Sequence, residues 1–327
     1  MQEQFHESTR LPSASLKLLL ARTNGQSLAR FAIQYSLLII SAAIIVVDST
    51  ATSYSYVWRS VAGFVFGLMA MSMFALGHET VHRSAFKSSV MNEVVCWLAC
   101  LPIYYVPEIF RQFHFAHHRH THHPGLDPEI SMGGKPIPSV TSSLPLYLLW
   151  LSGLPVLFYK VAVMLGGSFG HGRFVWQYLM PYVPQRSKKR VRWESRAALC
   201  FHVVFIYAAW QWLPGLWNIL WAQWLGHAML AIYLTTEHNG LPHAGSAIAR
   251  TRTMLTNRAI KFLMWNMPYH AEHHAYPAVP WHALPMLHQQ IQDELKHTES
   301  SYARFHSRVL SEVSLGKAFQ EAIDQVK

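Results

Sequence analysis

The chain has 327 residues, of which 51% are hydrophobic and only 13% are charged, about half the charged share of a typical soluble domain. The net charge is +10, but basic stretches beside long apolar runs indicate contact with anionic lipid, which excludes a nucleic-acid-binding protein. The three cysteines form no C-x-x-C pair, so the sequence excludes a disulfide framework and argues against an internal iron–sulfur centre. The composition indicates one membrane-embedded domain.

Four apolar runs are long enough to cross a bilayer as helices. They cover residues 31–47, 57–77, 197–213 and 216–235. The dipeptide Pro214-Gly215 between the last two is typical of a tight turn between antiparallel helices. Two further apolar runs are expected to lie in or dip into the interface. Residues 94–106 are too few to cross, and residues 144–166 are interrupted by two prolines and a glycine.

The positive charges predict the topology. Basic residues in segment 1–30 place the N-terminus in the cytoplasm, and the basic loop near residue 190 belongs on the same side. An even number of crossings must then separate these segments, and the last hairpin returns the chain to the cytoplasm. The prediction is an all-α membrane protein with about four transmembrane helices, interfacial helices and a cytoplasmic histidine-rich cap. Residues 31–285 form the membrane domain, and residues 286–327 form a cytoplasmic helical tail.

Histidines recur at short fixed spacings near the cytoplasmic ends of the spans. Positions i, i+3 and i+4 share one face of a helix, so each cluster points its imidazoles in one direction. One metal rarely takes more than about three to five such ligands, so eight imidazoles predict two metals held between distant segments. The clusters are His78 with His82, His114 with His117 and His118, and His270 with His273 and His274.

Several neighbours of these clusters are further candidates. His238 follows the fourth span on the same side of the membrane; it is either a ninth ligand or an interface residue with ordinary hydrogen bonds. Asp127 and Glu129 are expected to hydrogen-bond a ligand imidazole and fix its tautomer, although Asp127 before a proline also fits a simple turn. Glu272 points away from the third cluster, whose helix should begin just after Pro268, and is expected to be solvated.

The first cluster also fits the H-E-x-x-H pattern of zinc proteases, in which Glu79 would be the general base. That interpretation leaves the other clustered histidines unexplained. A membrane zinc protease is therefore the minor alternative to a two-metal site, and a membrane metal carrier or sensor is a non-catalytic alternative.

The three clusters resemble the histidine boxes of the membrane fatty acid desaturase and hydroxylase superfamily, namely HxxxH, HxxHH and HxxHH. The stretch from His117 to Glu129 resembles the extended second box. The stretch from Asn266 to Pro280 resembles the extended third box, so Asn266 is expected to lie beside the ligands. The resemblance spans residues 60–285.

The resemblance implies a non-haem di-iron centre on the cytoplasmic face. It would use O2 and two electrons to oxidise unactivated C–H bonds in a lipid acyl chain, most simply by desaturation. A fatty acyl or carotenoid hydroxylase, a ketolase and an alkene-forming fatty acid decarboxylase are alternatives within the superfamily. No cytochrome motif is present, so electrons are expected from a separate ferredoxin, rubredoxin or cytochrome-type donor. A bacterial inner membrane is the expected location.

A substrate tunnel is expected beside the metals, because a tunnel of fixed depth sets which carbon reaches them. Candidate lining residues lie on the second and fourth spans, although such a stripe equally fits plain helix packing. They are Met69, Met73, Phe74, Trp224 and Met229.

Overall fold

The computed structural model describes residues 11–47 and 53–321 of the chain, and these are helical almost throughout. The α-helices are α1 (Ser13–Leu19), α2 (Gly25–Val47), α3 (Ser53–Val81), α4 (Ser89–Cys100), α5 (Pro107–His120), α6 (Leu144–Leu151), α7 (Leu154–Phe169), α8 (Lys188–Gln211), α9 (Trp217–His238), α10 (Arg258–Leu263), α11 (His270–Ala275), α12 (Leu284–Ile291) and α13 (Tyr302–Ser314).

Short elements connect these helices. The single turns are η1 (Leu101–Ile103), η2 (Phe174–Leu179), η3 (Gln185–Ser187), η4 (Pro214–Leu216), η5 (Ile248–Arg250) and η6 (Gln292–Glu294). The strands are β1 (Ser131–Met132), β2 (Lys135–Pro136), β3 (Thr253–Met254) and β4 (Thr298–Glu299). Strands β1 and β2 pair antiparallel, whereas β3 and β4 pair in parallel and tie the chain before α10 to the chain before α13.

Two helices are long and apolar enough to cross a membrane: α2, and α3 from Tyr56 to Val81. The third and fourth predicted spans are also helices, α8 and α9, but neither passes the same test. Basic residues fill the first turns of α8, and α9 carries Gln223 and His227 among its apolar residues. Their packing against α3 and α7 makes them part of the same helical body, and their crossing of the membrane stays a prediction.

Small residues let α3 and α9 approach closely. A Cβ added at Gly226 would lie 2.9 Å from the carbonyl oxygen of Gly67 and 2.9 Å from the Cβ of Ala70. Side chains of ordinary size would therefore separate the two helices, as in other tightly packed membrane helix pairs. This contact fixes the position of His238 at the end of α9 relative to His78 near the end of α3.

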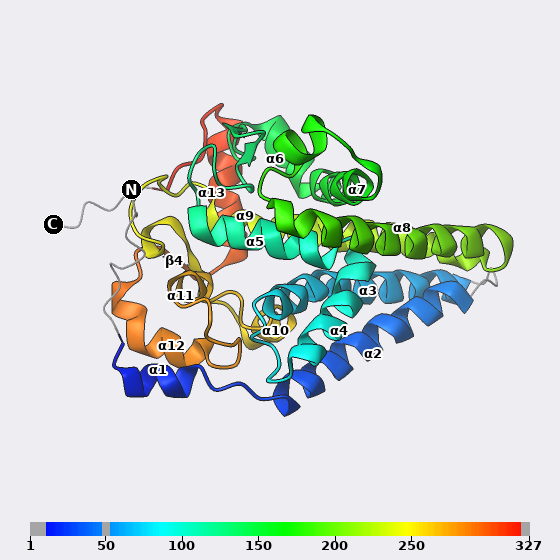
Figure 1. Ribbon diagram of the computed structural model, residues 1–327, viewed down its shortest axis with the longest axis horizontal. Helices are drawn as coiled ribbons and strands as arrows, with labels where there is room; N and C mark the ends of the chain where they lie inside the picture. Colours follow the sequence, from blue (N-terminus) through cyan, green and yellow to red (C-terminus); the bar gives the residue numbers. More distant parts are fainter. Residues whose placement is uncertain (1–10, 48–52, 322–327) are drawn as a thin grey trace.

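The end of α2 and the turn between α8 and α9 lie together at one end of the helical bundle. The Pro214-Gly215 turn is confirmed as η4, and a Cβ at Gly215 would lie 2.3 Å from the carbonyl oxygen of Val46 at the end of α2. The opposite end of the bundle carries α11 and α12, toward the left in Figure 1, while α2, α3 and α8 extend to the right. Of the predicted loop at residues 48–56, positions 48–52 lie outside the described residues.

Two sharply bent helix pairs flank this bundle. Helices α4 and α5 meet at 94°, and α6 and α7 meet at 65°, so each pair is a broken span or a segment that enters and leaves on one side. Tyr104 and Gly153 occupy the breaks with left-handed φ values of 60° and 73°. A Cβ at Gly153 would lie 2.3 Å from the backbone nitrogen of Ala228, so only glycine permits the second bend against α9. The two breaks fall within the apolar runs 94–106 and 144–166, whose interfacial position stays a prediction.

The basic stretch near residue 190 was expected to be a loop and is instead the beginning of α8. Its arginines have acidic neighbours within helical reach and on adjacent helices, which favours a helix over a solvated loop. Arg190 contacts Glu194 at 2.6 Å and Glu93 of α4 at 2.8 Å. Arg111 of α5 joins the network through Glu93 at 2.9 Å and Glu108 at 2.9 Å. The network holds α5, which carries the second histidine cluster, against α4 and α8.

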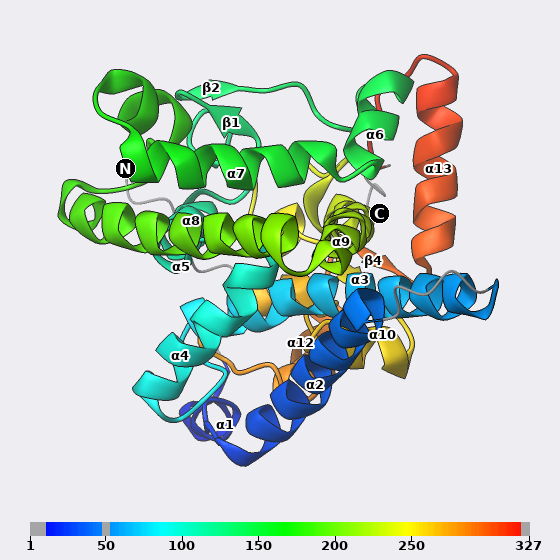
Figure 2. The ribbon, with the colours of Figure 1, turned by 90° about the vertical axis from the view of Figure 1, so that its right-hand side faces the viewer.

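The terminal segments pack on the bundle. Helix α1 lies against α12, and Leu19 is fully buried there with Leu287. Helix α13 stands beside α6, as Figure 2 shows, and buries Phe305 and Val309 with Tyr147 of α6. The described part of the predicted tail, residues 286–321, is partly helical and packs on the helical bundle, and its separation as a cytoplasmic tail stays a prediction.

Candidate metal centre

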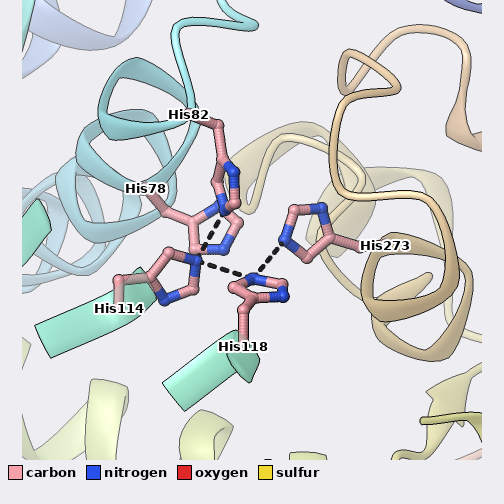
Figure 3. A group of neighbouring side chains, drawn as sticks. All are labelled: His78, His82, His114, His118 and His273. Carbon is pink, nitrogen blue, oxygen red and sulfur yellow. Dashed lines mark hydrogen bonds between the residues drawn. The ribbon is translucent and has the colours of Figure 1, made fainter. Parts of the chain in front are cut away.

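Five histidines from three segments of the chain converge on one point. His78 lies in the last turn of α3 and His82 directly follows that helix, His114 and His118 lie one turn apart on α5, and His273 lies on α11. Their nearest ring nitrogens lie within 4.8 Å of one another. Figure 3 shows the five rings turned toward a common centre. The Nε2 atom of His114 is 2.7 Å from that of His82 and 2.9 Å from that of His118, which is 3.0 Å from that of His273.

A second group of four histidines lies beside the first, and all four are buried. The Nε2 atoms of His117 and His274 are 3.3 Å apart, and those of His238 and His270 are 3.1 Å apart. The rings of His117 and His118 lie 5.8 Å apart between centroids, and those of His273 and His274 lie 5.9 Å apart. His117 and His118 therefore belong to different groups, and so do His273 and His274.

The nine predicted histidines are all in these two groups. The second and third clusters divide between the groups, because i and i+4 on α5 face one site while i+3 turns toward the other. The first cluster serves one group only. His238 completes the other and takes its orientation from a contact of 2.8 Å between its Nδ1 and the carbonyl oxygen of Arg250.

The two groups fit metal ions. Two ring nitrogens bound at about 2.1 Å to one metal lie roughly 3 Å apart at right angles, close to the separations of the Nε2 pairs. Both ring nitrogens of His78 are buried and have no hydrogen-bond partner among the described residues. Burial lowers the pKa of His270, His273 and His274 well below the usual value, so these rings are neutral, which is the form that binds a metal.

Carboxylates stand behind two of the rings. Both side-chain oxygens of Asp127 lie 3.0 Å from Nδ1 of His117, and Glu129 lies 3.6 Å from the same atom. The backbone N–H groups of His122 and Glu129 donate to Asp127 and hold it in place. Glu237 lies 3.5 Å from Nδ1 of His270. A carboxylate there fixes the tautomer that leaves Nε2 free for a metal.

Glu237 was missed in the sequence. It lies directly before His238 in the buried last turn of α9, and a glutamate buried at the end of an apolar span is the signal that would have found it.

A family profile described as fatty acid desaturase matches residues 56–306. This match covers most of the chain and includes all nine histidines. The chain belongs to the fatty acid desaturase family. It is 25% identical to a beta-carotene ketolase from Paracoccus over 66% of this chain and 74% of the ketolase. It is 24% identical to a chloroplastic omega-6 fatty acid desaturase from Brassica napus over 69% of this chain and 52% of that protein.

In this family member, Glu79 is placed poorly for the base of a zinc protease. Its carboxylate is fully buried and accepts hydrogen bonds from the hydroxyl of Ser84 at 2.9 Å and the backbone N–H of Trp281 at 3.2 Å. It lies 3.6 Å from Nδ1 of His78, behind the ring. The carboxylate therefore joins α3 to the chain after α11, and Glu79 does not line the cavity beside the histidines.

A cavity of about 610 Å³ lies beside the histidines. Its wall includes rings from both groups, namely His78 and His114 from the first and His117, His238 and His270 from the second. The rest of the lining is mostly apolar and aromatic and comes from α5, α7 and the loop that carries β1 and β2. Histidines of both groups therefore border one mostly apolar space.

The predicted tunnel residues are placed differently, and four of the five do not line this cavity. Phe74 does line it, 6.4 Å from His78 between ring centroids. Met69 and Met73 are buried in the helix core, and Met229 packs against the same core. Trp224 is 45% exposed and donates to the carbonyl of Ser152. The cavity opens toward α5 and α7, whereas the prediction placed it among the spans themselves.

Two other expectations near the third cluster need correction. The side-chain amide of Asn266 donates to the carbonyl of Trp281 at 2.9 Å, so its link to the histidines is indirect. Glu272 does face away from the histidines but is fully buried rather than solvated, where it accepts from the hydroxyl of Thr253 at 2.5 Å and contacts His288. Parallel pairing of β3 with β4 covers this position. The third cluster does open a helix, since His270 is the first residue of α11.

Proposed function

We propose that the protein is an O2-dependent di-iron oxidoreductase that introduces a double bond into a lipid acyl chain. One observation carries the proposal: two adjacent groups of converging imidazoles both contribute rings to the wall of the same mostly apolar cavity. Unactivated C–H bonds need an oxidant stronger than any side chain, and redox-active metals can supply one. Membership of the fatty acid desaturase family supports the same chemistry.

The residues would divide between two irons as the two groups divide. The first iron would take ligands from His78, His82, His114, His118 and His273, and the second from His117, His238, His270 and His274. When bound, the irons supply the activation of O2 and the one-electron steps. Nitrogen ligands alone suit several metals, so the choice of iron rests on the reaction that the family carries out.

The chain's own residues orient and shield this site. Asp127 holds the ring of His117 from behind, so that its Nε2 atom is presented in one orientation, and Glu237 lies 3.5 Å from Nδ1 of His270. Aromatic side chains, among them Phe74 and Phe110, line the cavity together with the histidines. These walls exclude water and place an apolar chain beside the rings, where small shifts in position decide which carbon reacts.

A ketolase or hydroxylase acting on a carotenoid is the second candidate. The relative from Paracoccus, which is named a beta-carotene ketolase, favours it, since its match extends over most of both chains. Either reaction would use the same histidines, and the two differ in what the cavity accepts. A fatty acid decarboxylase and an acyl hydroxylase would share them as well.

Electrons would come from a separate ferredoxin, rubredoxin or cytochrome-type protein. Exposed basic residues near the start of α8, such as Arg186 and Lys189, support a docking site for an acidic donor. The same charges support a cytoplasmic position for the site at an inner membrane.

Lipid profiling tests the proposal. A host that expresses the chain should accumulate an acyl product with a new double bond, located by mass spectrometry, and a host that expresses the His273→Ala variant should not. A parallel profile of carotenoids tests the second candidate. Unchanged acyl lipids together with a keto-carotenoid would replace desaturation by ketolation. No change in either class would reject both.

A further inference from the structure

A lysine lies in the wall of the cavity. Lys160 of α7 is 1% exposed, and its Nζ has no hydrogen-bond partner among the described residues. A lysine amine carries only donors, and burying it without an acceptor costs free energy. The cavity is the adjacent space from which an acceptor can come.

Aromatic contacts connect this lysine to the histidines. Its Nζ lies 4.0 Å from the ring centroid of Tyr105, which stacks on Phe110 of α5 at 4.2 Å. The ring of Phe110 in turn lies 5.9 Å from that of His114. The contact with Tyr105 offsets part of the burial cost but accepts no conventional hydrogen bond. A group held by Lys160 would therefore sit in the same cavity as the reacting carbon, a few rings from the candidate irons.

Two phenol hydroxyls also border the cavity, one from Tyr159 of α7 and one from Tyr182 in the chain between η2 and η3. The hydroxyls of Tyr159 and Tyr182 are 3.0 Å apart, and both residues line the cavity. Since one hydroxyl donates to the other, the pair keeps one O–H donor for a ligand. Among the described lining residues, Lys160 is the one lysine or arginine, and no carboxylate lies within ion-pairing distance of it. One cation with a phenol suits a single carboxyl group and not a phosphate, for which several cations are usual.

We propose that Lys160 binds a carboxyl oxygen of the substrate inside the cavity. This inference rests on the proposed function and names its substrate class: an acyl chain whose carboxyl group, as a free acid or an ester, enters the cavity with the chain. A hydrocarbon such as a carotene would leave the amine buried and unpaired. Lys160 thus selects acyl substrates over hydrocarbons.

Equilibrium binding of radiolabelled palmitate, methyl palmitate and hexadecane to the purified protein in lipid nanodiscs tests this, with empty nanodiscs subtracted. The protein should bind palmitate about tenfold to a hundredfold more tightly than hexadecane. Equal binding of the ester indicates that a carbonyl oxygen suffices, whereas weak binding of the ester indicates a free acid. The Lys160→Met variant should bind palmitate no better than hexadecane, while Lys296→Met, at an exposed position, should behave as the parent protein.

The proposal is overturned if the parent protein binds the three ligands equally or binds none of them. Undiminished preference for palmitate in Lys160→Met overturns it as well. Should that variant fail to fold, the comparison of ligands on the parent protein still decides. These outcomes are separate from the test of the reaction: a new double bond in lipid without any preference for a carboxyl group would leave the proposed function in place and remove only the role of Lys160.

Discussion

Single residues behind the histidines set how firmly the site holds a metal. Asp127 contacts Nδ1 of His117 through both oxygens, and an amide in its place would keep the shape but lose the charge. We expect Asp127→Asn to weaken metal binding about tenfold to a hundredfold, since outer carboxylates typically contribute that much. Metal titration of the purified apoprotein measures this. Asp293→Asn, at an exposed position, is the matched control. Equal affinity in both variants would show that Asp127 has no part in orienting His117.

Glu79 separates the di-iron interpretation from the zinc protease. His117→Ala and His273→Ala should each abolish turnover, because each removes a candidate ligand from a different group. Glu79→Gln should keep much of the activity, since Glu79 hydrogen-bonds Ser84 and Trp281 and does not line the cavity. Assays of the three variants after confirming their folding measure this. A Glu79→Gln variant as inactive as the histidine variants, yet with its full metal content, would favour the protease.

The spacing of residues in the sequence predicted best those site residues that lie close together along the chain. The i, i+3 and i+4 spacing found eight of the histidines, and the neighbouring turn suggested Asp127. Glu237 and Lys160 belong to no histidine spacing, so the pattern does not mark them, and the packing of distant helices shows what they face. The predicted tunnel residues show the same difference: Phe74 lines the cavity, whereas helix packing buries Met69 and Met73 in the core.

At the scale of elements, the crossing of α3 and α9 sets the relative positions of the histidines at their ends. Gly226→Ala places a Cβ 2.9 Å from the backbone oxygen of Gly67. We expect a loss of about 1–3 kcal/mol in unfolding free energy, because backbone atoms of two packed helices cannot yield without moving the helices apart. The midpoint of thermal unfolding, followed by near-ultraviolet circular dichroism, gives the direction and size of the change.

Gly25→Ala is the control for this variant, since nothing lies within 4 Å of a Cβ at that position at the start of α2. Equal midpoints for the two variants and the parent protein would contradict the close contact between α3 and α9.

The sequence predicted the helices well where a long apolar run defines them, and less well where ion pairs to other helices stabilise a charged segment. The first two spans and the turn at Pro214 agree with α2, α3 and η4. The basic stretch became helical because Arg190 pairs with Glu194 and with Glu93 on another helix, a contact that the local sequence does not reveal. The bends between α4 and α5 and between α6 and α7 depend on left-handed residues whose partners are distant.

At the scale of the whole molecule, we expect the 48–56 loop and the Pro214-Gly215 turn on one side of the membrane and the histidines on the other. Single cysteines at positions 120 and 189 of a cysteine-free variant should react with an impermeant reagent only from the cytoplasmic side. Cysteines in the 48–56 loop and at position 215 should react only from the opposite side, in keeping with the packing of Gly215 on Val46. Reaction of positions 120 and 189 from opposite sides would break the shared-site arrangement, because α5 and the start of α8 lie together.

The central claim is that nine histidines hold two irons, and metal analysis of the purified protein tests it most directly. Elemental analysis by mass spectrometry, normalised to protein by amino-acid analysis, should find two irons per active chain. His273→Ala should lower the content by removing a ligand of the first group, and His238→Ala by removing one of the second. A reproducible single zinc per chain, with activity restored to the apoprotein by zinc alone, would contradict the di-iron account.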